Sequence, residues 1–545
     1  MRLPHLFLSA LTALSSAQTF RNPVLWEDYP DLDVFRVGSV YYYSSSTFAY
    51  SPGAPLLKSY DLVNWEPITH SVPTLNFGAK YNLTSNTRAY VKGIWASTLR
   101  YYAKRDVFIW LGCVEGRTYI WTASGTNAAK NNGEVEASAW NWLPKGSLSV
   151  CYYDSGLLID EQDDGSVRMY VAYGNPRISI AEIRMEEDGT FNEVSAGRVV
   201  YDPGQGITVE GARLYKKGKG EYVIFVTRPA DQEIVLRSTG GIYGPYTSKM
   251  LVNRIQGPLS NAGYAHQGGM VDTEEGRWYY VAFLDAYPGG RIPVVAPMVW
   301  GGDGFPRVET DSGERWGVEY GMPVNTTRRV SVNLGTDEFK GGRLSEHWEW
   351  NHNPDGGKWR LEGSGGLVLQ TVDVTGDLFA ARNTLTRRIV GPKSSGTFRM
   401  DVSGMRDGDR AGAVLFRDRS AYVGVHKEGT TAKVVVVTGF SLTQSSWETS
   451  GRGSVVATGP TLGNATDVWF KMEADVTPAF GTSTERTVLF SYSVDGGKTF
   501  VRLGPAVPLA NSWQYFTGYR FGVFNHATKT LGGEVKVKSF TLAKI

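Results

Sequence analysis

The sequence contains little cysteine, with only Cys113 and Cys151 among its 545 residues. Neither cysteine has a second ligand at the spacing of a metal motif, so no cysteine-based metal site is predicted. In an oxidising compartment the two can form one disulfide, and two buried thiols are an equal alternative. The redox state of the pair therefore stays open at this point.

Net charge is also nearly absent. The 56 Lys and Arg residues almost cancel the 54 Asp and Glu residues, which leaves a formal charge of +2. Nucleic acids, anionic membranes and polyacidic substrates select for a marked charge bias that this chain does not have. We therefore expect a neutral partner and no nucleic acid or membrane partner, and we take a monomer as the working expectation.

Long apolar runs are missing after the N-terminus, because no later stretch reaches the roughly 20 apolar residues that a transmembrane helix needs. The first 18 residues, MRLPHLFLSALTALSSAQ, combine a basic start, a short apolar run and small residues at the end, which is typical of a secretory signal. N-x-[ST] sequons at Asn82, Asn325 and Asn464 agree with export. We predict that residues 1–17 are a cleaved signal peptide and that the mature protein is secreted.

Helical periodicity is scarce as well. Short runs of β-branched and aromatic residues, separated by Gly, Asp and Asn, occupy the chain instead, and this pattern predicts an all-β protein. A chain of 545 residues is too long for one compact core, so two domains are expected.

Five similar segments occur in the first 330 residues. Each has a polar or aromatic leader, an apolar strand, a charged or glycine turn and an aromatic strand, as in DSGLLIDEQDDGSVRMYVAYG. The leaders lie 64, 59, 56 and 56 residues apart, which allows one four-stranded sheet per repeat and is typical of propeller blades. We predict a five-bladed β-propeller over residues 18–330, with the leaders Asp31, Trp95, Asp154, Glu210 and His266.

These leaders are candidate site residues, because the first strand of each blade lines the central channel of a propeller. Side chains that are far apart in sequence would then meet at one mouth. The alternative is that Asp and Glu often precede strands because short acidic side chains satisfy turn amides. A carboxylate at three equivalent positions favours the shared site.

Residues 335–545 show alternating strands such as TAKVVVVTG and EVKVKSFTL, without the leader repeat. A separate β-sandwich of jelly-roll type is therefore predicted. Trp348 and Trp350 in this part could stack on sugar, although core positions are the more common use of such residues. The role of this domain does not follow from its sequence.

Three converging carboxylates with aromatic neighbours indicate hydrolysis of a glycosidic bond, because that reaction needs a proton donor and a proton acceptor on opposite sides of the sugar. The third carboxylate can raise the pKa of the acid by like-charge repulsion. A metal cage is the less favoured alternative, because the D-x-D-x-D-G pattern of calcium loops surrounds none of the leaders.

A family resemblance supports this interpretation. The motifs NPVLWEDYPDLDVFRVG, GIWAS, YYDSGLLID, VEGARLY, AHQGGMVDT and GGRIPVVAP resemble, in this order, the signatures of glycoside hydrolase family 43 and cover almost all of residues 20–305. The resemblance implies five-bladed propeller enzymes that invert the anomeric centre, mainly β-xylosidases, α-L-arabinofuranosidases and arabinanases. The C-terminal part is similar to the β-sandwich that many members append.

The resemblance also implies roles for the three carboxylates. Asp31 matches the general base that activates water, Asp154 matches the residue that tunes and orients the acid, and Glu210 matches the general acid. Three motifs depart from the family pattern, with Leu32 in place of Pro, Ser97 in place of Pro after Trp95-Ala96, and Ala212-Arg213 in place of Pro-His. Glu27 and Asp28 then fall in the loop that enters the first blade.

Further residues are implied as sugar contacts. Phe48 and Trp95 match apolar platform residues, Tyr153 is expected to shape the sugar subsite, and Arg291 matches the arginine that contacts sugar hydroxyls and catalytic carboxylates. His266 matches a channel histidine that lies next to calcium or a water cluster in many members. No cofactor is required, and a structural calcium near His266 is the one metal expectation. The alternatives are core aromatics, a structural ion-pair partner and a hydrogen-bonded core histidine.

The leading hypothesis is a secreted, exo-acting, inverting hydrolase that releases L-arabinofuranose from arabinoxylan, with doubly substituted xylose units as targets. In such an enzyme the two carboxyls that act as base and acid stand roughly 6.5 to 9.5 Å apart. Action as a β-xylosidase on xylo-oligosaccharide ends is the first alternative. A catalytically silent carbohydrate-binding propeller is the second.

Overall fold

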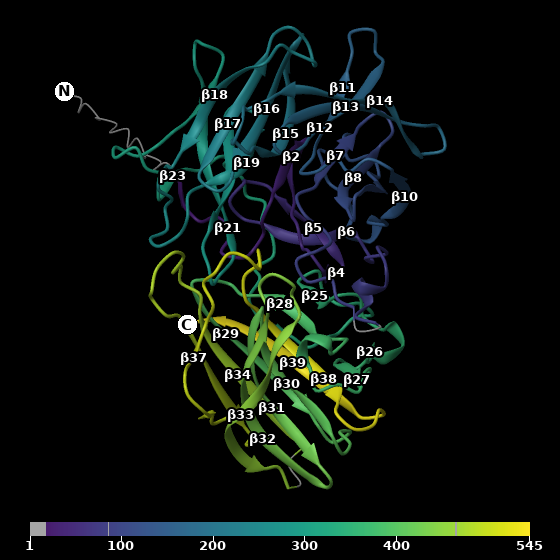
Figure 1. Ribbon diagram of the computed structural model, residues 1–545, viewed down its shortest axis with the longest axis vertical. Coiled ribbons are helices and arrows are strands. Elements are labelled where there is room, and N and C mark those ends of the chain that lie inside the picture. The colour runs from purple at the N-terminus through teal and green to yellow at the C-terminus, as the bar shows by residue number, and fades with distance from the viewer. Residues whose placement is uncertain (1–17, 85–86, 464–465) are drawn as a thin grey trace, which may run out of the picture.

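The computed structural model describes residues 18–84, 87–463 and 466–545. A propeller formed by the first part of the chain lies above a sandwich formed by the last part (Figure 1). The predicted signal peptide, residues 1–17, and the sequon at Asn464 lie outside the described residues. The remaining two sequons start at Asn82, which is half-buried, and Asn325, which is exposed.

The propeller consists of five four-stranded antiparallel sheets, each built from four strands that are consecutive within the blade. Blade I contains β2 (Asp33–Val37), β3 (Val40–Ser44), β5 (Gly53–Ser59) and β6 (Glu66–Val72). Blade II contains β7 (Thr98–Tyr102), β8 (Val107–Val114), β9 (Arg117–Ser124) and β10 (Leu143–Leu148). Blade III contains β11 (Gly156–Glu161), β12 (Val167–Tyr173), β13 (Ile178–Met185) and β14 (Phe191–Tyr201). Blade IV contains β15 (Glu210–Gly218), β16 (Glu221–Arg228), β17 (Gln232–Ser238) and β18 (Thr247–Asn253). Blade V contains β19 (His266–Asp272), β20 (Trp278–Asp285), β21 (Arg291–Trp300) and β22 (Pro306–Val308).

The first strands of the blades form a closed ring. β2, β7, β11, β15 and β19 contact one another in this order, and β19 contacts β2 to close the circle. Apolar side chains fill the space between neighbouring blades; Val34 and Tyr41 of blade I, for example, share a core with Val271 and Tyr279 of blade V. The prediction of a five-bladed propeller is confirmed, and each predicted leader lies at or just before the start of an inner strand.

Short elements and one covalent link complete this part of the molecule. β1 (Thr19–Arg21) pairs with β23 (Glu319–Gly321) outside the five blades. Cys113 in β8 and Cys151 form a disulfide, with 5.0 Å between their Cα atoms, which ties blade II to the segment that leads into blade III. The described residues contain four short 3₁₀ helices: η1 (Ala79–Asn82), η2 (Ala137–Ala139), η3 (Gly356–Lys358) and η4 (Leu378–Ala380). Within the described ranges no helix is long and apolar enough to cross a membrane.

The C-terminal part is a β-sandwich, as predicted, made of a nine-stranded and an eight-stranded sheet. The nine-stranded sheet contains β24 (Gly335–Asp337), β26 (Trp359–Leu361), β27 (Leu367–Gln370), β29 (Lys393–Asp401), β34 (Asp467–Asp475), β35 (Thr487–Ser493), β36 (Val501–Arg502), β37 (Val507–Pro508) and β39 (Glu534–Lys544). The eight-stranded sheet contains β4 (Tyr50–Ser51), β25 (Trp348–Asn351), β28 (Leu385–Arg388), β30 (Asp409–Phe416), β31 (Arg419–Glu428), β32 (Thr431–Leu442), β33 (Thr449–Thr461) and β38 (Arg520–Ala527). Trp348 and Trp350 are buried in the core between the sheets, so the interpretation as core residues is confirmed.

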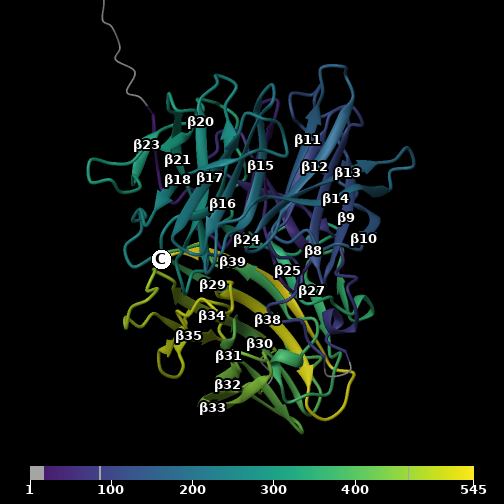
Figure 2. The ribbon, with the colours of Figure 1, turned by 45° about the horizontal axis from the view of Figure 1, so that its top comes forward.

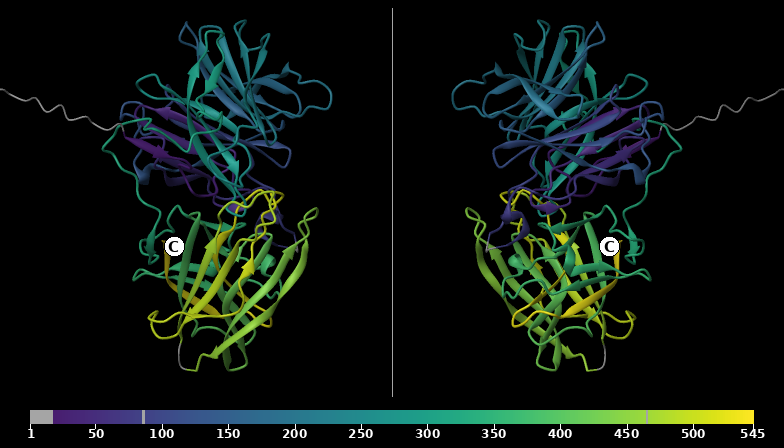
Figure 3. Two further views of the ribbon diagram at one scale, coloured as in Figure 1. Left: turned by 90° about the vertical axis from the view of Figure 1, so that its left-hand side faces the viewer. Right: turned by 90° about the vertical axis from the view of Figure 1, so that its right-hand side faces the viewer.

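The two parts share hydrogen-bonded strands and loops. β4 belongs by sequence to blade I, yet it pairs with β25 at the edge of the eight-stranded sheet, with Ser51 opposite Trp350. In the turned view of Figure 2, β39 is labelled close beneath the propeller. In the side views of Figure 3, yellow loops of the sandwich reach up to the propeller. One of these loops, residues 509–519, carries side chains into the site described next.

Candidate active site

Three carboxylates from three blades meet at the end of the inner strands where the strands begin. Asp31 and Asp154 each lie two residues before an inner strand, and Glu210 is the first residue of β15. The two aspartates are 5% and 6% exposed. Both have a positive φ, 54° for Asp31 and 49° for Asp154, a region that is costly for residues other than glycine. The same unusual backbone therefore recurs at equivalent positions of two blades.

The Asp31 carboxylate is held by two donors. Ser46 Oγ donates to Asp31 Oδ2 at 2.5 Å, and Arg291 Nη1 donates to Asp31 Oδ1 at 2.8 Å. The second bond is charge-assisted and is therefore the stronger kind. The orientation of this carboxylate is thus fixed through both of its oxygens. The contact with Ser46 was not predicted from the sequence.

The other two carboxylates form a pair with a strong tendency to hold a proton. Burial, together with the charges of Glu210 and Asp31, raises the pKa of Asp154 well above its usual range. Burial and the Asp31 charge also raise the pKa of Glu210, although Asn175 opposes this by donating to Glu210 Oε2 at 2.6 Å. Tyr153 donates to the same oxygen at 3.5 Å. Like-charge crowding thus keeps one proton on this pair at pH values where isolated carboxyls are ionised.

Arg213, which departs from the family pattern, joins the segments that carry the carboxylates. Its buried guanidinium donates to the backbone oxygens of Leu32 at 2.9 Å, Ser155 at 2.7 Å and Asp31 at 3.1 Å. The first and third oxygens belong to the entry of blade I, and the second to the entry of blade III. One side chain of blade IV therefore sets the spacing between two other blades at the site.

Arg291 lies between Asp31 and a second acid. Its Nε is 3.4 Å from Asp285 Oδ1, and its guanidinium lies over the rings of Phe283 and Phe516 at 5.1 and 5.0 Å. Asp285, which is 4% exposed, was not singled out from the sequence. Its position just before the AYPGGR turn carries no repeat signal that would have revealed it.

His266 is a hydrogen-bonded channel residue. Its Nδ1 lies 2.9 Å from the Tyr264 carbonyl oxygen, and its Nε2 lies 4.0 Å from Asp285 Oδ2. Burial lowers its pKa, so the imidazole is neutral at neutral pH.

The surroundings of His266 do not fit the calcium that the resemblance allows. Calcium takes six to eight oxygen ligands, whereas the nearby Asp285 carboxylate is engaged by Arg291. Over the described parts of the chain, no group of three or more His, Cys, Asp or Glu side chains is placed to hold a metal ion. The expectation of His266 as a metal-site residue is therefore corrected to a role in the polar lining of the channel.

The predicted aromatic contacts lie in two pairs. Trp95 and Tyr153 meet edge to face, with 6.1 Å between ring centroids. Phe48, which also has a positive φ of 55°, stacks on Phe516 with centroids 5.6 Å apart. All of the sequence-predicted site residues thus come from the strand entries and loops at this one end of the propeller.

Phe516 is the most consequential residue that the sequence analysis missed, because it comes from the sandwich. It is half-buried and contacts both Phe48 and Arg291. Trp513, three residues earlier and 46% exposed, lies edge to face against it at 5.6 Å. The only available signal was the aromatic density of NSWQYFTGYR, which is not specific for a site.

Comparison with known proteins places this geometry in a family. Residues 20–306 match the family described as Glycosyl hydrolases family 43. Residues 336–543 match the Beta xylosidase C-terminal Concanavalin A-like domain. The chain belongs to glycoside hydrolase family 43, and it is a glycoside hydrolase.

Relatives with similar architecture carry two kinds of activity in their names. A solved structure of an engineered GH43 glycoside hydrolase, described as displaying both endo-xylanase and exo-arabinofuranosidase activity, is 62% identical, covers 97% of this chain and 100% of its own, and has a TM-score of 0.93. A beta-xylosidase of Formosa agariphila is 27% identical over 96% of this chain and 90% of its own. A non-reducing end alpha-L-arabinofuranosidase of Bacteroides ovatus is 26% identical over 89% of this chain and 91% of its own.

Proposed function

We propose that the protein is an exo-acting, inverting hydrolase that releases L-arabinofuranose from arabinoxylan. The observation that supports it best is the asymmetry of the three carboxylates. Asp31 is fixed by Ser46 and Arg291, whereas burial and like charges raise the pKa values of Asp154 and Glu210. One side of the site is therefore suited to accept a proton and the other to donate one.

In this mechanism Asp31 takes a proton from a water molecule whose oxygen attacks C1 of the sugar. Glu210 gives its proton to the departing glycosidic oxygen as the C1–O bond breaks. Asp154 keeps Glu210 protonated before the reaction and orients it. The single displacement inverts the anomeric centre. A proton-NMR time course checks this step, because first appearance of the anomer that retains the substrate configuration would contradict inversion.

The sugar assignment is supported by the exo-arabinofuranosidase activity in the description of the relative that is 62% identical. Action as a β-xylosidase is the second candidate, supported by the Formosa agariphila relative. The two pentoses present similar faces, so a few side chains decide between them. Rates on p-nitrophenyl arabinofuranoside, p-nitrophenyl xyloside and singly and doubly substituted arabinoxylan oligosaccharides separate these alternatives, and the doubly substituted units are the expected best substrates.

Catalysis itself is tested by pentose release from wheat arabinoxylan. The parent should release pentose and Glu210→Ala should not, while Glu187→Ala, which alters an exposed glutamate far from the site, should match the parent. Equal release by the parent and Glu210→Ala would remove Glu210 from the mechanism. No release by any of the three would favour a carbohydrate-binding propeller.

We further propose that the protein acts outside the cell. The disulfide between Cys113 and Cys151 supports an oxidising compartment, in line with the secretory pattern of residues 1–17. N-terminal sequencing of the protein from culture medium should find Gln18 first. The monomeric state stays a prediction that sedimentation can check.

A further inference from the structure

Asp28, three residues before the proposed base, makes two contacts that the mechanism above does not use. Its carboxylate is 3% exposed. Oδ1 accepts a hydrogen bond from the backbone N–H of Arg291 at 2.8 Å, and Oδ2 accepts one from the backbone N–H of Gly518 at 2.9 Å. The first donor belongs to blade V and the second to the sandwich loop. One carboxylate therefore joins three parts of the molecule.

Both donors lie next to groups that face the site. Arg291 holds Asp31 through its side chain, and its guanidinium lies 5.0 Å from the ring of Phe516. Gly518 is two residues after Phe516 in the same loop. Asp28 thus fixes the backbone beneath two side chains that contact each other beside the base.

The junction around Asp28 is tightly packed. A Cβ atom on Gly290, whose φ is +99°, would lie 2.3 Å from Asp28 Oδ1. A Cβ atom on Gly518 would lie 2.2 Å from the Gly289 carbonyl oxygen. Both glycines are needed for the carboxylate to reach the two N–H groups at once, which is the close approach that glycine permits.

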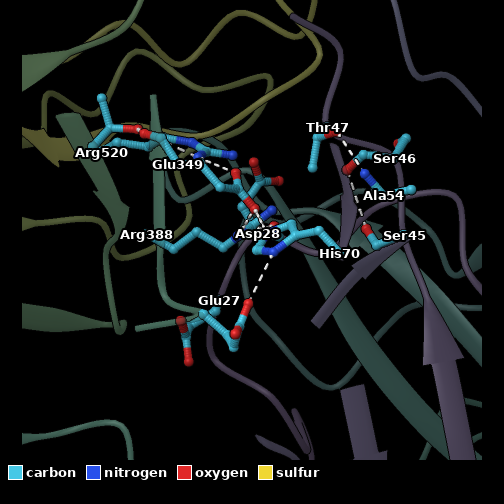
Figure 4. Close-up of polar contacts among 12 residues, drawn as sticks. Glu27, Asp28, Ser45, Ser46, Thr47, Ala54, His70, Glu349, Arg388 and Arg520 are labelled. Atoms are coloured by element: carbon cyan, nitrogen blue, oxygen red, sulfur yellow. Dashed lines mark hydrogen bonds and ion pairs between the residues drawn. The ribbon is translucent and has the colours of Figure 1, made fainter. Parts of the chain in front are cut away.

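Buried charged residues of the sandwich also hold the main chain of Asp28. Arg388 Nε donates to the Asp28 carbonyl oxygen at 2.7 Å. The same guanidinium donates from Nη1 to Glu349 Oε1 at 2.8 Å, and Arg520 Nη1 donates to Glu349 Oε2 at 2.5 Å. Figure 4 shows Asp28 beside this group of charges. The position of Asp28 is therefore set by the sandwich as well as by the propeller.

We propose that Asp28 is a positioning residue that couples the sandwich loop to the catalytic arginine, and so sets where Phe516 and Arg291 hold the sugar. This inference rests on the proposed function of the site. Asp28 does not touch the substrate in this scheme. In this scheme the sandwich domain affects the active site through the position of the loop that carries Phe516.

The test is a double-mutant cycle of Asp28→Asn and Phe516→Ala. Asparagine keeps the shape of the side chain but turns one of its two acceptors into a donor, so one of the two N–H groups loses its partner. Because small misplacements of contact groups slow enzymes strongly, we expect Asp28→Asn to lower kcat/KM by about tenfold. In the Phe516→Ala background the same change should cost about threefold or less, because coupled residues are not additive.

Two results would overturn the proposal: an Asp28→Asn enzyme with parental kcat/KM, or a full loss that persists unchanged in the Phe516→Ala background. Rates are measured with both p-nitrophenyl arabinofuranoside and p-nitrophenyl xyloside, so that a wrong sugar assignment leaves the cycle intact. If Asp28→Asn does not fold, Gly518→Ala carries the test. It displaces the same loop from the other side and should show the same dependence on Phe516.

Asp61→Asn is the matched control. Asp61 is 4% exposed and also accepts two backbone N–H groups, from Val63 at 2.9 Å and Asn64 at 2.7 Å. It lies between β5 and β6 of blade I, and its side-chain hydrogen bonds go to Ser59, Val63 and Asn64. It should lose thermal stability as Asp28→Asn does while its kcat/KM stays within about twofold of the parent. If Asp61→Asn lost as much kcat/KM as Asp28→Asn, the effect of Asp28→Asn would be explained by weakened packing alone.

Discussion

Two groups of buried charges lie on either side of Asp28 and behave in opposite ways. The catalytic cluster has three acids and one cation: Asp31, Asp154, Glu210 and Arg291. The interface cluster has one central acid and three basic groups: Glu349, Arg388, Arg520 and His70, which Figure 4 shows together. Burial acts to raise the pKa of Asp154 in the first cluster and that of Glu349 in the second. In the catalytic cluster like charges add to that effect on Asp154, whereas Arg388 and Arg520 reverse it and hold the pKa of Glu349 well below its usual range.

The balance of neighbours, rather than burial alone, therefore decides what a buried carboxyl can do. An acid-rich group holds a proton that it can give away, and this is useful in catalysis. An acid surrounded by basic groups stays ionised and fixes an assembly, because breaking one of its pairs leaves an uncompensated charge. Changes that alter each balance should have distinct effects on turnover and on stability.

The largest effect should come from Asp31→Asn, which removes the base from the catalytic cluster. Turnover should fall by about 10²–10⁴-fold, the usual contribution of a general base. The melting temperature should stay close to that of the parent, because Arg291 keeps Asp285 as a partner. Initial rates and thermal melting measure the two quantities.

Asp33→Asn is the control for this prediction. Asp33 is buried two residues further along and holds Arg100 at 2.6 Å and the Leu99 backbone N–H at 3.0 Å. Its substitution should lower stability and leave most of the turnover. The opposite pattern, with turnover lost in Asp33→Asn and kept in Asp31→Asn, would show that the proposed base is wrong.

Glu349→Gln should break the interface cluster. Two buried arginines lose their charged partner, so the free energy of unfolding should fall by about 3–5 kcal/mol. Folded molecules should keep the Arg388 contact to the Asp28 carbonyl oxygen, so their turnover should fall far less than that of Asp31→Asn. Urea denaturation and rates below the transition measure these effects. The control is Asp163→Asn, because Asp163 forms an ion pair with Lys219 in which the two side chains are 74% and 87% exposed. It should change neither the free energy of unfolding nor the rate. An equal loss of stability in Asp163→Asn would contradict a special role for the buried ion pairs of Glu349.

Asn175→Ala tests the role of Glu210 as the acid of the catalytic cluster. Its amide donates to Glu210 Oε2 and lowers the Glu210 pKa. Without that bond the acid stays protonated to higher pH, so the alkaline limb of the kcat/KM profile should move upward in pH. The matched change is Asn192→Ala, because Asn192 donates to Glu186 at 3.0 Å on the outer side of blade III. It should leave the profile unchanged, and a downward shift in Asn175→Ala would contradict the assignment of Glu210.

The change with the smallest effect on turnover concerns Glu233, a buried acid in β17 that accepts the backbone N–H of Gln267 at 3.0 Å. Burial raises its pKa from 4.5 to about 8. Its contribution to stability is fully present below pH 4.5 and is lost as pH rises toward 8. The melting temperature of Glu233→Gln should therefore fall less than that of the parent across this window. Glu187→Gln at the surface should follow the parent, and an unchanged slope in Glu233→Gln would refute the shift.

The sequence predicted those features that follow from internal repetition. Leaders at similar spacing imply equivalent blades, and the closed ring then brings Asp31, Asp154 and Glu210 to one end of the propeller. Contacts between segments that no repeat relates could not be predicted from the sequence. Asp28 meets Gly518 across 490 positions of the chain, and no periodicity relates them. For the same reason Asp28 was assigned to the entry loop without a role.

Partners that depend on side-chain geometry were also missed. The His266 motif alone suggested calcium, because a motif does not reveal that Arg291 already engages the nearby Asp285. Phe516 gave only the unspecific signal of an aromatic-rich segment, because its place beside Phe48 and Arg291 depends on how the sandwich packs against the propeller. Sequence patterns therefore located the proposed proton-transfer groups better than the groups that hold the sugar.

The pairing of β4 with β25 has a consequence for how the enzyme is made. Tyr50 and Ser51 leave the ribosome long before Asn351 and Trp350, their partners in the sheet. At about 5–20 residues per second, the interval is on the order of tens of seconds. During that time the loop that carries Phe48 has neither its strand partner nor Phe516. The contact between Phe48 and Phe516 can therefore form only after residue 516 has been translated.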